Sequence, residues 1–327
     1  MRRRALQIGL RLLGPALLVV VLARIEDPAR ILEVFARAEW LPLCLVVGLN
    51  AVNIHLKVVR FQWLLKAQGY PYSLGRAWSS LLSCMYIGLL TPGRVGDILR
   101  VQYLRRDLGM LYSESLAFIA MDRFCDIYVI LGFCAFGIAR FASLLTGQLA
   151  YATWMTVAFC AIAPAVLLVP GLADRILARL FARFSRTGEP VGPHVFLKTL
   201  RGLVGRPLIG ALPLTVSAFL GFYVQGWLIA KSLGLPLGLF DAVCFMSMTG
   251  LLSQVPISIS GLGVRELFLA LVFPALGMTA AEGVAFGLME FAVIHLTQVA
   301  AGFVSWQYAP PPILPKQAEE TPAASSS

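Results

Sequence analysis

Charged residues are scarce in this sequence, and the common catalytic signatures are missing from it. Only 13% of the 327 residues are Asp, Glu, Lys or Arg, whereas about 25% is typical of soluble domains. This scarcity excludes an ordinary water-exposed protein. The motifs GxSxG, HExxH, GxGxxG and the P-loop do not occur, so we expect neither an enzyme of those classes nor ATP-driven pumping by this chain alone.

Histidine and cysteine are also few. The three histidines are too scattered along the chain to propose a metal site, and the six cysteines form no CxxC pair. Most of the cysteines lie inside apolar runs, where they are interpreted as packing residues. We therefore expect no metal and no other cofactor.

Long apolar runs dominate what is present. Hydrophobic residues make up 58% of the chain, and its mean hydropathy is +0.79. A helix needs about 20 apolar residues to cross a bilayer, so the pattern predicts an all-α polytopic membrane protein. About six full transmembrane helices are expected, at 8–23, 41–56, 115–139, 150–170, 207–230 and 281–306.

The basic residues report topology rather than a nucleic-acid partner. The formal charge is +10, but Lys and Arg lie in a few stretches between apolar runs and not on one soluble domain. Residues 57–114 hold eight basic and three acidic residues, and residues 171–206 hold seven and two. The positive-inside rule then places these stretches and the amino terminus, with its four Arg in residues 1–11, in the cytoplasm. The carboxyl terminus is expected on the same side. The opening MRRR and apolar run resembles a signal peptide, but we expect the first helix to be retained.

The apolar segments 77–90 and 267–277 look short for a full crossing. Residues 77–99 lie between the basic stretches 57–76 and 100–106, so a re-entrant hairpin over 77–106 is predicted, turning at 91–93, where Thr-Pro-Gly breaks a helix. Residues 242–277 are predicted to form a second hairpin, entering from the outside and turning around 256–263. The domain is expected to cover 1–308, with a disordered cytoplasmic tail at 309–327.

The two halves of this domain, 41–139 and 207–306, repeat one plan in opposite orientations. Interrupted short segments at corresponding places in two halves indicate an inverted-repeat transporter with its substrate site between them. Gly96 precedes Asp122 by 26 residues, and Gly263 precedes Glu290 by 27. Coincidence is the alternative, since polar residues in membrane helices are few.

A group of charges lies inside the apolar run 115–139. Asp122 and Asp126 share a helix face at i, i+4, and Arg123 reaches Asp126 at i, i+3. Charges at membrane depth cost several kcal/mol unless they are paired or hydrated, and they often mark a substrate path. The alternative is a structural ion cluster that locks helices together. Glu290, His295 and Gln298 on the last helix raise the same question, and His295 is interpreted as a packing residue rather than a proton relay.

Arg94 and Arg265 each stand beside glycines, where backbone N–H groups and a guanidinium can together bind an anion such as phosphate. The alternative is that they only neutralise Asp97 and Glu266. Lys57 and Arg60, one turn apart before a tryptophan, are interpreted as an interfacial anchor, and the alternative is that they also attract lipid headgroups.

Four motifs resemble the membrane domain of the lysylphosphatidylglycerol synthase/flippase proteins and related flippase-like proteins. They are RFQWLL at 60–65 followed by Gly69, TPGRVGDILR at 91–100, MDRFCD at 121–126 and SISGLGVRE at 258–266. The resemblance implies an inner-membrane protein that moves lipid headgroups between leaflets. It also implies which residues bind the headgroup: Arg94, Asp97, Arg100, Asp122, Arg123, Asp126, Arg265 and Glu266, with Glu290 added from the charge pattern above.

Two positions depart from the pattern of the family. The acidic residue before Arg123 is Asp122 here, and Glu290-Phe291 stands where many relatives have an arginine, which puts the charge balance and the headgroup in doubt. No aminoacyltransferase domain follows the last helix, so any lipid synthase is expected to be a separate protein.

The leading hypothesis is a lipid translocase for an anionic or aminoacylated phospholipid or a polyprenyl-phosphate-linked lipid. One alternative is a non-transporting lipid-binding partner of an envelope-lipid synthase. Another is a membrane enzyme that uses Asp122 and Asp126 as acid and base. Oligomers are possible, because glycine pairs at 132 and 137 and at 283 and 287 allow close helix packing.

Overall fold

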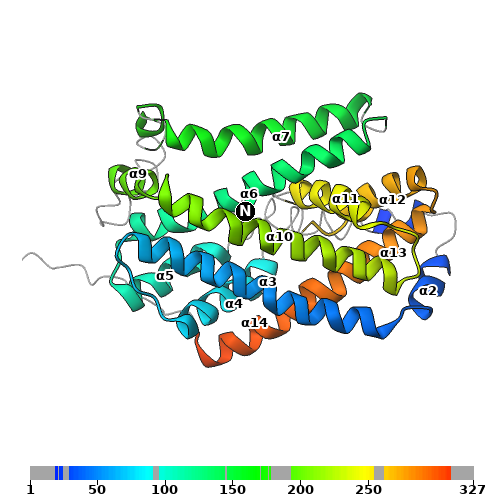
Figure 1. Cartoon of the computed structure of the whole chain (residues 1–327), viewed down its shortest axis with the longest axis horizontal. Helices are drawn as coiled ribbons and strands as arrows, with labels where there is room; N and C mark the ends of the chain where they lie inside the picture. Colours follow the sequence, from blue (N-terminus) through cyan, green and yellow to red (C-terminus); the bar gives the residue numbers. More distant parts are fainter. Residues whose placement is uncertain are drawn as a thin grey trace, which may run out of the picture.

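The protein is helical throughout the part that the structure describes. The computed structural model describes residues 19–20, 22–24, 29–90, 96–143, 146–169, 171–175, 177, 193–253 and 261–310. Long helices run side by side along the long axis of the molecule (Figure 1). The predicted helix at 8–23 and the tail at 311–327 lie almost entirely outside the described residues.

Three helical segments are long and apolar enough to cross a membrane. They are α3 (Trp40–Ala67), α10 (Arg206–Ser232) and a rod, Ala280–Tyr308, in which α13 (Ala280–Glu290), η3 (Phe291–His295) and α14 (Leu296–Tyr308) follow without a break. Two further long helices, α6 (Tyr112–Arg140) and α7 (Gly147–Leu168), cover the predicted runs 115–139 and 150–170. Helix α6 carries charges in its interior, which sets it apart from a simple apolar span.

The short predicted segments form two pairs of short helices. The first pair is α4 (Leu74–Leu90) and α5 (Gly96–Leu108), and the second is α11 (Leu239–Leu252) and α12 (Val264–Val272), which continues into η2 (Phe273–Leu276). The two pairs lie toward opposite ends of the bundle (Figure 1). The predicted turn at 91–93 and most of the one at 256–263 lie outside the described residues, but both helix interruptions fall where Gly and Pro predict them.

Glycine lets the helices of each pair, and those of the two halves, approach closely. A side chain at Gly96 would collide with the backbone of Cys84 and Gly88 on α4. Similarly, a side chain at Gly221 on α10 would collide with Asn53 on α3. Gly221 therefore leaves room for the Asn53 side chain where α3 crosses α10.

Three of the four glycines considered for contacts between copies are used within the chain. Gly137 packs against Cys244 of α11, while Gly283 and Gly287 pack against α12. Nothing lies within 4 Å of a side chain built at Gly132. These glycines explain the packing inside one chain, so only Gly132 is left for a contact with another copy.

Buried apolar side chains gather in two clusters within the described residues, one toward each end of the bundle. The first is built around α3, α4 and α6 with α9 (Pro193–Gly202), and the second around α10 to α13 with α2 (Ala29–Ala36). Buried charges and amides lie between these clusters.

Candidate functional site

A cavity of about 150 Å³ lies between the two helix pairs and is lined from both halves of the chain. Its wall includes side chains from α3, α5 and α6 and, on the other side, from α12 and α13. A cavity needs roughly 10–15 Å³ of this kind of volume to hold a water molecule, so there is room for a hydrated headgroup. The charged residues of the wall are Lys57, Asp97, Arg123, Asp126, Arg265 and Glu290.

Arg60 is the centre of the buried charge cluster beside this cavity. Its side chain has no exposed surface, and its Nε and Nη2 atoms donate to Oδ1 of Asp122 at 2.9 and 2.7 Å. Its Nη1 atom donates to Oδ1 of Asp126 at 2.6 Å and to Oγ1 of Thr215 at 3.1 Å. One planar guanidinium thus satisfies two carboxylates one helical turn apart, a geometry that arginine provides and lysine does not.

The interfacial-anchor interpretation of Arg60 is wrong for this reason. The predicted i, i+4 pairing of Asp122 and Asp126 on one face of α6 is confirmed, and that face is turned toward Arg60 on α3. The sequence signal was available: two carboxylates at membrane depth require a cation, and Arg60 lies in an apolar helix. The sequence does not specify how α3 is rotated about its axis, and this rotation directs Arg60 toward α6.

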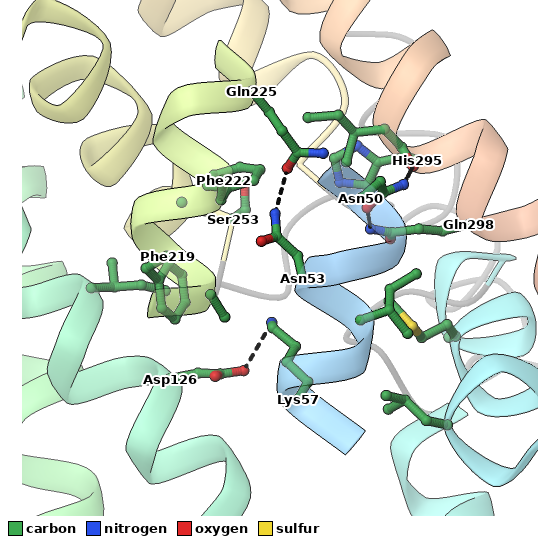
Figure 2. A pocket seen from close by; sticks show the side chains of 18 of the residues that line it. Asn50, Asn53, Lys57, Asp126, Phe219, Phe222, Gln225, Ser253, His295 and Gln298 are labelled. Carbon is green, nitrogen blue, oxygen red and sulfur yellow. Dashed lines mark hydrogen bonds and ion pairs between the residues drawn. The ribbon is translucent and has the colours of Figure 1, made fainter. Parts of the chain in front are cut away.

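Lys57 and Arg123 are the cations of this cluster that line the cavity. The Lys57 Nζ atom lies 3.5 Å from Oδ2 of Asp126, and Figure 2 shows the two side chains pointing toward each other. Arg123 lies 3.5 Å from Asp126, as the i, i+3 spacing predicts, and 3.6 Å from Asp97. Both side chains are about a quarter exposed, at 26% and 23%, so they can reach a ligand in the cavity.

Arg100 lies behind the wall rather than in it. Its Nη1 atom donates to Oδ2 of Asp122 at 2.9 Å, and its guanidinium stacks 3.8 Å from the centre of the Phe61 ring. This group of described residues has one positive charge in excess. It holds four cations, Lys57, Arg60, Arg100 and Arg123, and three carboxylates, Asp97, Asp122 and Asp126.

The second group of charges is fixed by the glycine turn before α12. Gly261 and Gly263 have φ values of +79° and +85°, which side chains rarely adopt. The Gly263 N–H donates to Oε2 of Glu266 at 2.5 Å, so Glu266 caps the first turn of the helix. Arg265 donates to Oε1 of Glu266 through Nε at 3.0 Å and Nη2 at 2.5 Å. Glu266 is fully buried and takes no part in the cavity wall.

Glu290 faces Arg265 from the last rod. Its Oε2 atom lies 3.5 Å from the Arg265 Nε atom, and both side chains are 3% exposed. Glu290 immediately precedes η3, a π-helical turn over Phe291–His295. Such turns widen an α-helix locally and often occur at functional sites. Here the turn lies beside the cavity, which Glu290 and His295 both line.

Amide side chains form the middle of the wall, and sequence reasoning raised Gln298 as a candidate but missed Asn50, Asn53 and Gln225. Asn53 donates to Gln225 at 2.8 Å, and Gln298 donates to Asn50 at 3.0 Å (Figure 2). Oδ1 of Asn53 accepts no hydrogen bond from the described residues. Hydrogen bonds between amide side chains of this kind hold neighbouring helices together within a membrane. Asn50 and Asn53 lie one turn apart on α3, but Gln225 and Gln298 stand on two other apolar helices, so no spacing within one helix reveals that these amides meet.

The predicted site residues thus fall into two sets. Five of them line the cavity. Asp122 and Glu266 lie behind it as counter-ions of Arg123 and Arg265, and Arg100 lies behind it paired with Asp122. Arg94 is outside the described residues. No three His, Cys, Asp or Glu side chains in the described ranges are grouped as metal ligands.

Comparisons with known proteins agree with the arrangement of the motifs. The family described as "Lysylphosphatidylglycerol synthase TM region" matches residues 6–302. A curated relative, "Glycosyltransferase AglD" of Haloferax volcanii, is 24% identical over 339 aligned residues, which cover 92% of this chain. The alignment covers 54% of that protein, so the chain spans about half the length of the curated relative it matches.

Proposed function

Because the chain belongs to the lysylphosphatidylglycerol synthase transmembrane-region family, we propose that this multi-pass membrane protein is a lipid translocase. Its cargo is an anionic or aminoacylated phospholipid or a polyprenyl-phosphate-linked lipid, which it moves between leaflets of the inner membrane. The observation that carries the proposal is the charged cavity, because side chains from both halves meet in it. A headgroup held there is shielded from the hydrocarbon of the bilayer, while its acyl chains stay outside.

The proposed binding mode follows from which cations can reach the cavity. Arg123 and Lys57 approach a phosphate from one side, and Arg265 approaches it from the other. Each of these cations now pairs with a carboxylate at 2.5–3.6 Å, so a phosphate must compete with that carboxylate. This competition weakens the hold on the phosphate, so the headgroup can be released as well as bound, which transport requires.

The proposed topology has six full spans and two re-entrant hairpins arranged as an inverted repeat, with both termini in the cytoplasm. Support comes from the two pairs of short helices at opposite ends of the bundle (Figure 1). In this arrangement α4 and α5 enter from the cytoplasm, and α11 and α12 enter from the outside. The cavity then lies between the two hairpins, as inverted-repeat transporters place their sites.

We also propose that this chain is not itself an enzyme. Asp122 and Asp126, the candidate acid and base, both accept hydrogen bonds from Arg60 and are almost fully buried. Carboxylates held by a guanidinium stay ionised and are poor proton donors. The transferase activity in the name of the Haloferax relative belongs to a protein nearly twice as long.

That relative favours one second candidate, a lipid-binding partner of an envelope-lipid synthase. A region similar to this chain makes up 54% of a protein named as a glycosyltransferase, so such regions occur together with synthetic activities. A partner of this kind binds the lipid in the same cavity but does not move it between leaflets.

Leaflet exchange in proteoliposomes tests the proposal. Fluorescent phosphatidylglycerol, aminoacyl-phosphatidylglycerol and polyprenyl phosphate are each incorporated, and the fraction protected from an external quencher is followed over time. Arg123→Gln and Lys57→Gln should slow exchange of the transported lipid at least tenfold, because both cations line the cavity. Arg106→Gln, on the exposed face of α5 and paired only with Asp107 in the described residues, is the matched control and should behave as wild type. Binding without exchange would favour the partner function instead.

A further inference from the structure

Glu290 is a buried carboxylate whose hydrogen bonding is incomplete. It is 3% exposed and lines the cavity, and its Oε2 atom accepts no hydrogen bond from the described residues. The Arg265 Nε atom is 3.5 Å away, which is an ion-pair distance but too long for a good hydrogen bond. A carboxylate in such a position is expensive to keep ionised.

Arg265 cannot satisfy Glu290 because it is already committed to Glu266. Two of its nitrogens donate to the Glu266 Oε1 atom, and the Gly263 N–H holds the other Glu266 oxygen. One guanidinium is therefore shared unequally between two buried carboxylates. Among these three described side chains there is one negative charge in excess, and a proton on Glu290 removes it.

Among the described residues, the other elements around Glu290 bring no second Lys or Arg within ion-pair distance of it. Helix α12 contributes Arg265, which is paired with Glu266 behind the wall, and η3 contributes His295 to the cavity. The α10 side of the cavity is uncharged in the described residues, with Phe219, Phe222 and Gln225. Helix α2 packs against the far end of α13, where Arg30 pairs with Glu33 and Glu282. Across the cavity, Lys57 and Arg123 are paired with Asp126.

We propose that Glu290 couples the lipid to a proton: it takes up one proton when a phosphate headgroup binds Arg265 and releases it when the headgroup leaves. The inference rests on the proposed function, since it requires an anionic headgroup in the cavity. The phosphate and the Glu290 carboxylate compete for the same guanidinium, so a bound phosphate removes the only cation that stabilises ionised Glu290 at close range in the described residues. The proton adds to a carboxylate oxygen of Glu290, and nothing is oxidised or reduced.

This competition works equally in both directions. If phosphate binding increases the proton affinity of Glu290, protonation of Glu290 must increase the affinity for phosphate by the same factor. Lipid affinity therefore falls as the pH rises through the range in which Glu290 ionises. A proton gradient across the membrane then favours loading of the lipid from the acidic side.

Calorimetric titration of the purified full chain tests the coupling without requiring transport. Short-chain phosphatidylglycerol is added in two buffers of different ionisation enthalpy at the same pH, and the difference in apparent enthalpy gives the protons taken up. Proton uptake by wild-type protein should be largest, up to about one per lipid, between the pH at which Glu290 ionises in the free protein and the higher pH at which it ionises with lipid bound, and should fall on either side. Glu290→Gln should bind the lipid with no uptake from this site and with an affinity that no longer changes with pH.

Glu282→Gln is the matched control, because it lies on the same helix outside the cavity and glutamine keeps its capping role at the helix start. This variant should take up protons as the wild type does. Lipid binding by wild-type protein without proton uptake at any pH would overturn the coupling and leave the translocase intact, even if Glu290→Gln fails to fold. Failure of wild-type protein to bind or exchange any anionic lipid would overturn both proposals.

Discussion

At the residue scale, the fold depends on Arg60 because two carboxylates of α6 have no other equally close cation in common within the described residues. Replacing one partner of a buried ion pair leaves an uncompensated charge, which costs ~3–5 kcal/mol. Arg100, Arg123 and Lys57 offset part of that cost, since each lies near one of the two carboxylates.

Arg60→Met should therefore lower the free energy of unfolding by roughly 2–4 kcal/mol, within the range for breaking a buried pair. Reversible unfolding in mixed detergent micelles measures this loss. Arg37→Met, at a side chain that is 71% exposed, is the control and should change stability by less than about 0.5 kcal/mol. A variant at position 60 that is as stable as the control would show that these ion pairs do not hold α3 to α6.

At the element scale, the turn before α12 positions the second charged group. The positive φ of Gly263 and its bond to Glu266 set the direction in which α12 begins, and with it the direction of Arg265. Gly277 has a similar φ of +78°, but nothing lies within 4 Å of a side chain built there, and it lies outside the cavity wall. The two glycines thus share the backbone constraint and differ in what they position.

Gly263→Ala and Gly277→Ala should each destabilise the protein by about 1–3 kcal/mol, because alanine is strained at such φ values. Only Gly263→Ala should also weaken lipid binding, by at least tenfold, since it displaces Arg265. Binding isotherms with short-chain phosphatidylglycerol, taken at a temperature where both variants stay folded, separate the two effects. Equal losses of binding in the two variants would contradict the positioning role of the turn.

The helix ends and the faces of single helices are largely predictable from the sequence, because they depend on residues close together in the chain. Gly and Pro interrupt apolar runs where the helix pairs break, and the 3.6-residue period places Asp122 and Asp126 on one face. The partners across helices are not predictable in this way. Arg60 and the amides at 50, 53, 225 and 298 meet only because of how α3, α10 and the last rod are rotated about their axes, which no single helix specifies.

At the scale of the whole molecule, the proposed inverted repeat predicts that the two helix pairs open to opposite sides of the membrane. Ser73, just before α4, and Lys231, near the end of α10, are both exposed and suit labelling. Cys44 is the exposed native cysteine, and the other five are buried. Both variants are therefore made with Cys44→Ser, which removes the native thiol that the reagent would label.

In sealed vesicles with the outer face exposed, a membrane-impermeant thiol reagent should label Lys231→Cys at once. Ser73→Cys should be labelled only after the vesicles are permeabilised, because the positive-inside rule places that loop in the cytoplasm. Mass spectrometry of the intact protein gives the labelled fraction. Labelling of both positions from the same side would contradict the inverted repeat.

The most direct measurement is photocrosslinking of a phospholipid that carries a diazirine in its headgroup, with the modified residues located by mass spectrometry. A headgroup site between the two halves predicts crosslinks to cavity residues of both, at 53–57 and 123–126 in one and at 265 and 290 in the other. Excess unlabelled lipid should remove these crosslinks. Label confined to the exposed apolar side chains of α7, such as Trp154 and Phe159, would contradict a headgroup site in the cavity.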